Sequence, residues 1–209
     1  VYRAPNASVL YNFQVTGATY GLTVSGGNLI SVGVADTIYI NTGISGSVSS
    51  SFASPGTSTK GLAALDGNLI SCDETGDNIS HHVGITSTIS NTFVAPGGNP
   101  TGLTVIDGDL ISCDRSLENI YRHDGISGSI LETISSPSVE PMGLTYDGVN
   151  LISCDKTNNL IYVHDGFSST ILRSFTSPVT APEGMAFDGE NVIVNGNNNN
   201  VYVLGNSPL

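Results

Sequence analysis

The stretch GLTYDGVNLISC at residues 143–154 decides the fold of this chain, because close versions of it occur five times. In each version a Gly followed by Leu or Met precedes the segment Asn/Asp-Leu/Val-Ile by a few residues. The glycines are Gly21, Gly61, Gly102, Gly143 and Gly184, so the steps are 40, 41, 41 and 41 residues. A fixed period of this size is typical of repeat architectures and predicts five copies of one structural unit.

One copy of the repeat contains the signals of four short strands. The Asp-Gly pair at 147–148 separates two apolar runs, which is a strong hairpin signal. A second Asp-Gly pair at 165–166 separates two further runs, and Ser177-Pro178 follows the last of them. We expect strands at residues 143–146, 150–154, 160–164 and 170–175.

Such a unit is partly apolar on both faces, so a neighbour must cover it on each side. Sheets that cover one another in a ring form a β-propeller. We therefore predict an all-β, five-bladed β-propeller with four antiparallel strands per blade, in which residues 1–209 form a single domain. The composition agrees, because only 11% of the residues are charged while Gly, Ser, Thr and Asn are abundant, as in short strands joined by tight turns.

The two ends of the chain are expected to complete one blade between them. The aromatic or branched residue that anchors the outermost strand recurs at Phe13, Phe52, Phe93, Ile134 and Phe175. The chain thus begins on an outermost strand, at residues 9–14, and stops on a third strand, at residues 201–204. We expect these two segments to pair and close the ring, a velcro closure that removes exposed sheet edges.

The same arrangement permits self-association. If residues 9–14 filled the gap of a neighbouring molecule, the subunits would form a head-to-tail polymer by strand donation. Closure within one chain is the expectation. Residues 1–7 lie ahead of this strand and outside the repeat, and this N-terminal extension is the segment that we expect to contact another subunit.

The chain is strongly acidic. Its formal net charge of −12 includes only six Lys and Arg, which leaves no basic stripe for phosphates and argues against nucleic acid and anionic membranes as partners. No apolar run approaches the roughly 18 residues of a membrane span. The chain opens at Val1 without a signal peptide, as a processed or trimmed product would. Sequons at Asn6 and Asn78 are expected by chance in a chain rich in Asn and Ser.

Three cysteines, Cys72, Cys113 and Cys154, occupy the same place in three successive repeats. Equivalent points on neighbouring blades are expected to lie roughly 10 Å or more apart, beyond the Cα separation of about 7 Å that a disulfide tolerates. We predict free thiols that pack between blades as small hydrophobes.

Three histidines, His82, His123 and His164, end the third strand of three copies. Because that strand lies far from the axis, these side chains are expected to be too far apart to share a metal, and to pack in the turn or lie exposed. His81 is expected to be exposed.

The segment at residues 151–162, LISCDKTNNLIY, resembles the NHL-type propeller repeat, in which a strand ends in Asp, a turn carries Asn and the next strand starts with Ile. The fourth copy keeps all three, at Asp155, Asn158 and Ile161. The second and third copies carry Gly76 and Leu117 where Asn158 stands. The first and fifth copies lose the Asp to Gly33 and Gly196.

This resemblance implies the propeller fold, and a function that ranges from RNA-binding and protein-binding modules to lyases and lactonases. Five blades of this length also look like the tachylectin type of sugar-binding propeller. The chain contains no Trp, although sugar-binding platforms usually present aromatic faces.

A ligand that binds once to a ring of five similar blades needs an asymmetric site. One position varies completely between the repeats, immediately before the innermost strand at the expected mouth of the central channel. Its residues are Tyr20, Lys60, Thr101, Met142 and Glu183. This ring is our candidate for ligand or partner binding, and variation at an exposed loop is the alternative explanation.

A trio of aspartates, Asp73, Asp114 and Asp155, ends the second strand on the same rim. Each could hold a cation or attract a basic partner. The more common role for such an Asp is to accept backbone hydrogen bonds in its own turn.

Enzyme chemistry has little support in the sequence. No nucleophile elbow, phosphate loop, His-Glu-X-X-His or dinucleotide motif occurs, and Glu183 is the one clear carboxylate near the start of an innermost strand. We therefore expect no catalytic residues, no bound metal and no cofactor. The expected function is a non-enzymatic extracellular or particle-surface module for adhesion, recognition or assembly, with a protein or glycan on one face of the disc. The alternatives are a carbohydrate-binding lectin and a metal-dependent propeller hydrolase or lyase.

Overall fold

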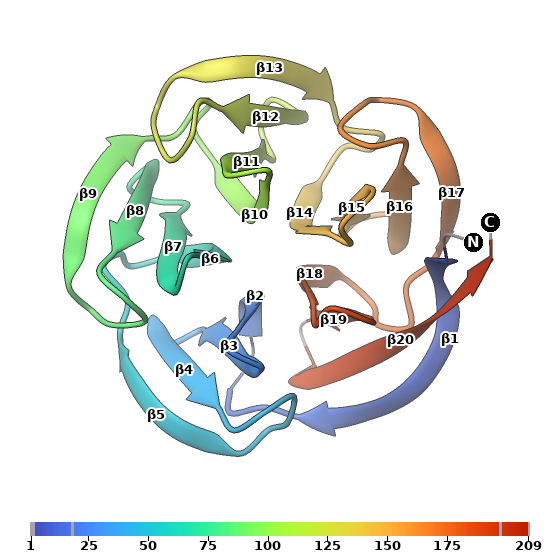
Figure 1. Ribbon diagram of the computed structural model, residues 1–209, viewed down its shortest axis with the longest axis horizontal. Coiled ribbons are helices and arrows are strands. Elements are labelled where there is room, and N and C mark those ends of the chain that lie inside the picture. Colours follow the sequence, from blue (N-terminus) through green and yellow to red (C-terminus); the bar gives the residue numbers. More distant parts are fainter. Residues whose placement is uncertain (1–2, 18, 197, 209) are drawn as a thin grey trace.

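The computed structural model describes residues 3–17, 19–196 and 198–208, which form twenty strands in five four-stranded antiparallel sheets. Figure 1 shows the sheets arranged like blades around a central axis. The described residues form no helix, so none of them belongs to a helix that could cross a membrane. The prediction of an all-β, five-bladed propeller is confirmed.

Within blades 1 to 4 the strands run from the axis outward in chain order. Blade 1 contains β2 (Thr19–Ser25), β3 (Asn28–Gly33), β4 (Thr37–Asn41) and β5 (Val48–Ala53). Blade 2 contains β6 (Thr59–Leu65), β7 (Asn68–Asp73), β8 (Asn78–His82) and β9 (Ile89–Val94). Blade 3 contains β10 (Pro100–Ile106), β11 (Asp109–Asp114), β12 (Asn119–His123) and β13 (Ile130–Ser135). Blade 4 contains β14 (Pro141–Tyr146), β15 (Leu151–Asp155), β16 (Leu160–His164) and β17 (Ile171–Thr176).

Blade 5 combines the two ends of the chain, as expected of a velcro closure. It contains β18 (Pro182–Phe187), β19 (Val192–Gly196), β20 (Asn200–Pro208) and, as its outermost strand, β1 (Arg3–Gln14). Phe13 pairs with Val201 as Phe175 pairs with Ile161 in blade 4. The N-terminal strand therefore occupies the position that β17 occupies in its own blade.

The closing strand begins earlier than the sequence indicated. β1 starts at Arg3 rather than at residue 9, because β20 continues to Pro208 and offers backbone partners to Arg3 and Pro5. The Arg173 guanidinium of blade 4 also donates a hydrogen bond from Nη1 to the Pro5 carbonyl at 3.1 Å. Residues 3–7 of the expected N-terminal extension thus belong to the closing strand, and residues 1–2 lie outside the described part of the chain.

The hairpins that join the two innermost strands follow from their turn residues. Asp66 and Gly67 both adopt positive φ, of 49° and 77°. Two successive residues in this region define the tight turn that matches the twist of paired strands, and Asp-Gly favours it.

The repeated glycine allows the innermost strands to approach one another closely. A Cβ atom on Gly102 would lie only 2.4 Å from the Met142 carbonyl oxygen of the next blade. The equivalent contacts join Gly21 to the Lys60 carbonyl, Gly61 to Thr101, Gly143 to Glu183 and Gly184 to Tyr20. The repeated glycine of each blade thus packs against the backbone of the variable position in the next blade.

The core lies between blades. Each apolar cluster combines residues of neighbouring sheets, such as Ile70 and Cys72 of blade 2 with Leu103 and Leu110 of blade 3. Cys72, Cys113 and Cys154 are buried free thiols, as predicted. Burial raises the pKa of the Cys113 thiol to about 12, so it stays protonated and unreactive at neutral pH.

Candidate functional site

The five innermost strands begin at one mouth of the central channel, on the face formed by the loops that enter each blade. The turns between the second and third strands of each blade lie on the same face, because the strands are antiparallel. The variable position lies there in all five blades, at Tyr20, Lys60, Thr101, Met142 and Glu183.

The side chains of this ring divide into two groups. Thr101 and Met142 are each only 2% exposed. Thr101 donates a hydrogen bond from Oγ1 to the Pro141 carbonyl at 2.8 Å, and Met142 packs in the cluster that contains Cys154. These two residues therefore contribute to packing between blades.

Tyr20, Lys60 and Glu183 instead take part in charged contacts around the mouth. We call this set the mouth belt; its members are Tyr20, Lys60, Glu74, Arg115, Glu140, Lys156 and Glu183. The first contacts join blades 1, 2 and 3: Lys60 Nζ lies 3.3 Å from the centroid of the Tyr20 ring and 3.8 Å from Glu74 Oε2, and Arg115 Nη2 lies 2.6 Å from Glu74 Oε1.

The belt continues through blades 4 and 5. Arg115 Nη1 lies 3.6 Å from a carboxylate oxygen of Glu140, whose other oxygen accepts a hydrogen bond from the Thr157 hydroxyl at 2.6 Å. Lys156 Nζ donates to Glu183 Oε1 at 2.6 Å, and the Glu183 side chain is only 3% exposed. Members of the belt therefore come from all five blades.

The belt is balanced in charge, with three carboxylates and three cationic side chains, in a chain whose net charge is −12. Three of the six basic residues of the whole chain gather there. The formal charges of the belt itself therefore sum to zero.

Lys60 is the most unusual member of the belt. Its side chain is only 12% exposed, and burial lowers the pKa of its ammonium group, although the nearby Glu74 and Glu183 carboxylates act in the opposite direction. Contact with the Tyr20 ring compensates part of the lost hydration, because a cation is attracted to the face of an aromatic ring.

Four of the seven members of the belt were not predicted from the sequence: Glu74, Arg115, Glu140 and Lys156. Glu74, Arg115 and Lys156 each follow directly after one of the repeated aspartates, where one blade carries an acidic side chain and two carry a basic one. Comparing that position across the repeats would have identified these three residues.

The three repeated aspartates connect loops. Asp73 accepts a hydrogen bond at Oδ1 from the Gly76 amide, within its own turn, and another at Oδ2 from the Ser58 amide of the loop that enters the blade; both distances are 2.6 Å. Asp114 and Asp155 make the equivalent pairs of contacts. These carboxylates hold the backbone that carries the mouth belt, and their oxygens are already engaged.

The three histidines lie in the blades, away from the mouth. His82 is fully buried, and its Nε2 lies 2.9 Å from the Ser71 hydroxyl while its Nδ1 lies 2.7 Å from the Thr86 carbonyl. His123 and His164 make the same contacts with Ser112 and Ser153 and with the carbonyls of Ser127 and Ser168. The three histidines thus pack in their turns and are not exposed. His81 is half-buried, although the sequence predicted that it would be exposed.

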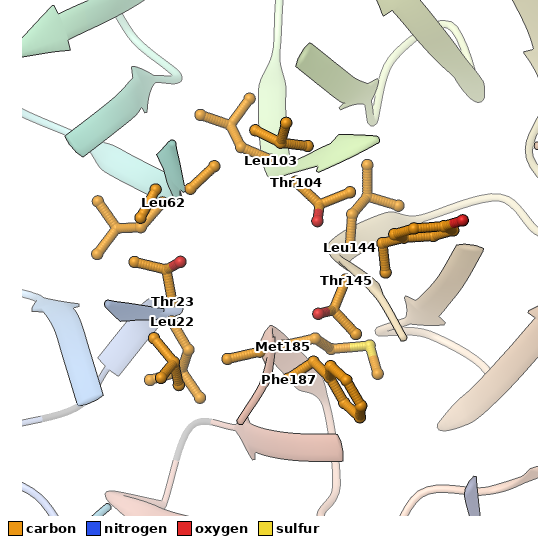
Figure 2. A pocket seen from close by; sticks show the side chains of 15 residues that line it. Leu22, Thr23, Leu62, Leu103, Thr104, Leu144, Thr145, Met185 and Phe187 are labelled. Atoms are coloured by element: carbon orange, nitrogen blue, oxygen red, sulfur yellow. The ribbon is translucent and has the colours of Figure 1, made fainter. Parts of the chain in front are cut away.

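The channel itself is narrow. Figure 2 shows the side chains that surround an axial cavity of about 160 Å³, among them Leu22, Leu62 and the hydroxyls of Thr23, Thr104 and Thr145. The cavity lining contains no carboxylate, histidine or cysteine. Within the described residues, no group of three or more such side chains is placed to hold a metal ion. The charged side chains described above therefore lie at the mouth, outside the lining of this cavity.

No protein-family model matches the chain, and no curated protein matches its sequence. Solved structures do match its fold. The crystal structure of Myxococcus xanthus glutaminyl cyclase superimposes with a TM-score of 0.82 at 13% identity, over 97% of each chain. The WD40 propeller domain of Doa1 has a TM-score of 0.62 at 16% identity, over 88% of this chain and 62% of the other.

A third similar structure is a catalytically inactive virginiamycin B lyase from Staphylococcus aureus with quinupristin, with a TM-score of 0.59 at 20% identity, over 91% of this chain and 66% of the other. At these identities the likeness shows the propeller fold alone. Two of the three similar structures are enzymes, so the likeness gives no support to the expectation of a non-enzymatic protein. An NHL-type origin of the repeat also receives no support.

Proposed function

We propose that the protein is a recognition module that binds a small polar ligand, or an exposed segment of a protein or glycan, at the mouth belt. The observation that supports this proposal is the concentration of unlike charged side chains at the two positions where the repeats differ. A site that is asymmetric in a ring of similar blades can bind one ligand in one orientation.

Packing between blades alone would not require this asymmetry. Blades 3 and 4 use Thr101 and Met142 at the variable position and are well packed with neutral, buried side chains. Glu183 is instead a carboxylate that needs Lys156 to neutralise it, at some cost in desolvation. Charged groups retained in such positions are typical of recognition surfaces.

The two faces of the disc offer a matched pair of variants. Arg115 lies 2.6 Å from Glu74 at the mouth, and Arg122 lies 2.8 Å from Asp109 near the opposite face; their side chains are 34% and 27% exposed. We expect Arg115→Gln to weaken ligand binding at least tenfold and Arg122→Gln to leave it unchanged. The screen would use small carboxylates, amines, monosaccharides and short peptides, with binding followed by NMR. Compounds whose binding weakens equally in both variants, or in neither of them, would contradict a site at the mouth.

A glutaminyl-cyclising activity is the second candidate. The similarity to the Myxococcus glutaminyl cyclase extends over 97% of both chains, and the mouth supplies one buried carboxylate, that of Glu183, next to an ammonium group. The test is release of ammonia from a peptide with an N-terminal glutaminyl residue, with Glu183→Gln as the variant expected to abolish it. No ammonia above the uncatalysed rate, with and without added divalent metal, would remove this candidate.

A further inference from the structure

The Lys60 ammonium group is not fully partnered within the mouth belt. The Glu74 carboxylate is 3.8 Å away, beyond hydrogen-bond distance, and Nζ makes no hydrogen bond to any residue that the structure describes. Its close contact is the Tyr20 ring, which faces the charge but accepts no conventional hydrogen bond. An ammonium group carries three donors, so donors remain for an oxygen atom from outside the chain.

The neighbouring carboxylates are already engaged with other cations. Glu74 lies 2.6 Å from Arg115, and Glu183 lies 2.6 Å from Lys156. Lys60 differs from Arg115 and Lys156 in this respect, since each of those has a carboxylate within hydrogen-bond distance. All three Lys60 donors are therefore open to an anion at the mouth, whereas Arg115 and Lys156 each have a donor engaged by a carboxylate.

The axial cavity begins two residues further along the strand that carries Lys60. Lys60 and Leu62 both belong to β6, and Leu62 lines the cavity. The cavity of about 160 Å³ is close to the roughly 150 Å³ that holds a benzene-sized ligand. The Thr23, Thr104 and Thr145 hydroxyls, which Figure 2 shows around the axis, could hydrogen-bond to polar groups of a compact ligand.

We propose that Lys60 forms a carboxylate subsite: a small carboxylate, of the size of a simple hydroxy acid or a sugar acid, accepts hydrogen bonds from Lys60 Nζ at the mouth of the channel. This inference rests on the proposed recognition function and names the class of ligand. Glu74, Glu140 and Glu183 disfavour a second anion nearby, so the subsite takes one carboxylate group.

The composition of the chain allows a direct test. Lys60 and Lys156 are the only two lysines, so protein labelled with ¹³C-lysine gives two Cε signals, which Lys60→Arg assigns. Acetate, glucuronate, glucose and methylammonium would be titrated at constant ionic strength. We expect acetate and glucuronate to shift the Lys60 signal with saturation at millimolar concentration, as for ligands of few heavy atoms, and to move the Lys156 signal much less. Glucose and methylammonium should not shift it.

A variant provides the second measurement. Lys60→Gln should raise the Kd of acetate, followed on the ligand signal, at least tenfold, and Arg122→Gln should not change it; circular dichroism melts of both establish that they fold. If carboxylates move both lysine signals linearly, as sodium chloride does, or move neither, the subsite is wrong. If another class of compound then binds, and Arg115→Gln weakens that binding while Arg122→Gln does not, the mouth remains a binding site. If no compound binds there, both proposals fail.

Discussion

Asn195 of blade 5 hydrogen-bonds to Thr19 of blade 1, and so joins the C-terminal strands to the N-terminal part of the ring. Its Nδ2 donates to the Thr19 carbonyl at 2.7 Å and also contacts the Thr19 hydroxyl, while its Oδ1 accepts from the Gly184 amide at 2.7 Å. Cys72 and Cys154 occupy the same place in blades 2 and 4, where each sulfur accepts the equivalent glycine amide. The only amide side chain at this position thus links β19, near one end of the chain, to β2, near the other.

Asn195→Val is expected to lower the free energy of unfolding by about 2–3 kcal/mol. The substitution keeps a buried side chain of similar size but leaves the Gly184 amide and the Thr19 carbonyl without these partners, and a buried polar group without a partner costs about 1–3 kcal/mol. Chemical denaturation of the variant and the parent measures the difference. An unchanged midpoint would mean that water or a shifted side chain replaces the amide.

The converse substitution is predicted to stabilise the protein. Blade 1 carries Val32 at this position. Thr59 of blade 2 is the repeat equivalent of Thr19, and its buried hydroxyl has no partner within the described residues, in contrast to the Thr19 hydroxyl. Val32→Asn would copy blade 5, donating to Thr59 and accepting from the Gly21 amide. We expect a gain of about 1 kcal/mol, the usual net value of one intramolecular hydrogen bond. Val32→Leu, which adds no polar group, is the control and should not stabilise.

Deletion of residues 1–14 is expected to prevent closure of the ring. The truncation removes β1 and leaves β20 as an unpaired edge strand, which favours association with other chains. Light scattering and circular dichroism should show loss of the folded monomer. A truncated chain that stays monomeric with an unchanged melting temperature would show that β1 is dispensable.

The sequence predicted the ring well and the site only in part, for reasons that lie in particular residues. The strands follow from a period of 41 and from turns such as Asp147-Gly148, which are local signals. Pairing of Arg3 with Pro208 depends on how far β20 continues, and nothing local encodes that. The burial of Met142 and Thr101 likewise depends on the neighbouring blade, whereas Lys60 and Glu183 could be recognised because charge stands out in a chain with so little of it.

The Lys60 ammonium group is predicted to titrate below the ordinary lysine pKa of 10.5. Burial disfavours its charged form and lowers its pKa, and Glu74 and Glu183 offset only part of this effect. The Lys60 Cε signal described above reports the pKa in a pH titration. Tyr20→Leu, which removes the ring that stabilises the cation, should lower the Lys60 pKa further. A Lys60 pKa at or above 10.5 would contradict the buried position of its amine.

Stability is expected to fall as the pH drops below about 6.5, because of the three buried histidines. Burial lowers the pKa of His82, His123 and His164 below the ordinary value of 6.5. The backbone carbonyl beside each Nδ1 can only accept, so Nδ1 carries the proton and Nε2 accepts from the serine hydroxyl. A second proton on Nε2 would prevent it from accepting, so the serine hydroxyl would have to turn and accept from Nε2 instead.

Between the folded-state pKa values and 6.5 the unfolded chain binds more protons, so the free energy of unfolding decreases with falling pH, by at most about 1.4 kcal/mol per pH unit for each histidine. Above 6.5 this contribution is fully present. Blade 5 supplies the control, since Val194 and Leu204 replace the Ser–His pair there and are fully buried. The double variant Ser153→Val, His164→Leu should therefore reduce the pH dependence of the denaturation midpoint by about one third. If the dependence between pH 5 and 7 keeps its full slope in that variant, carboxylates rather than these histidines cause it.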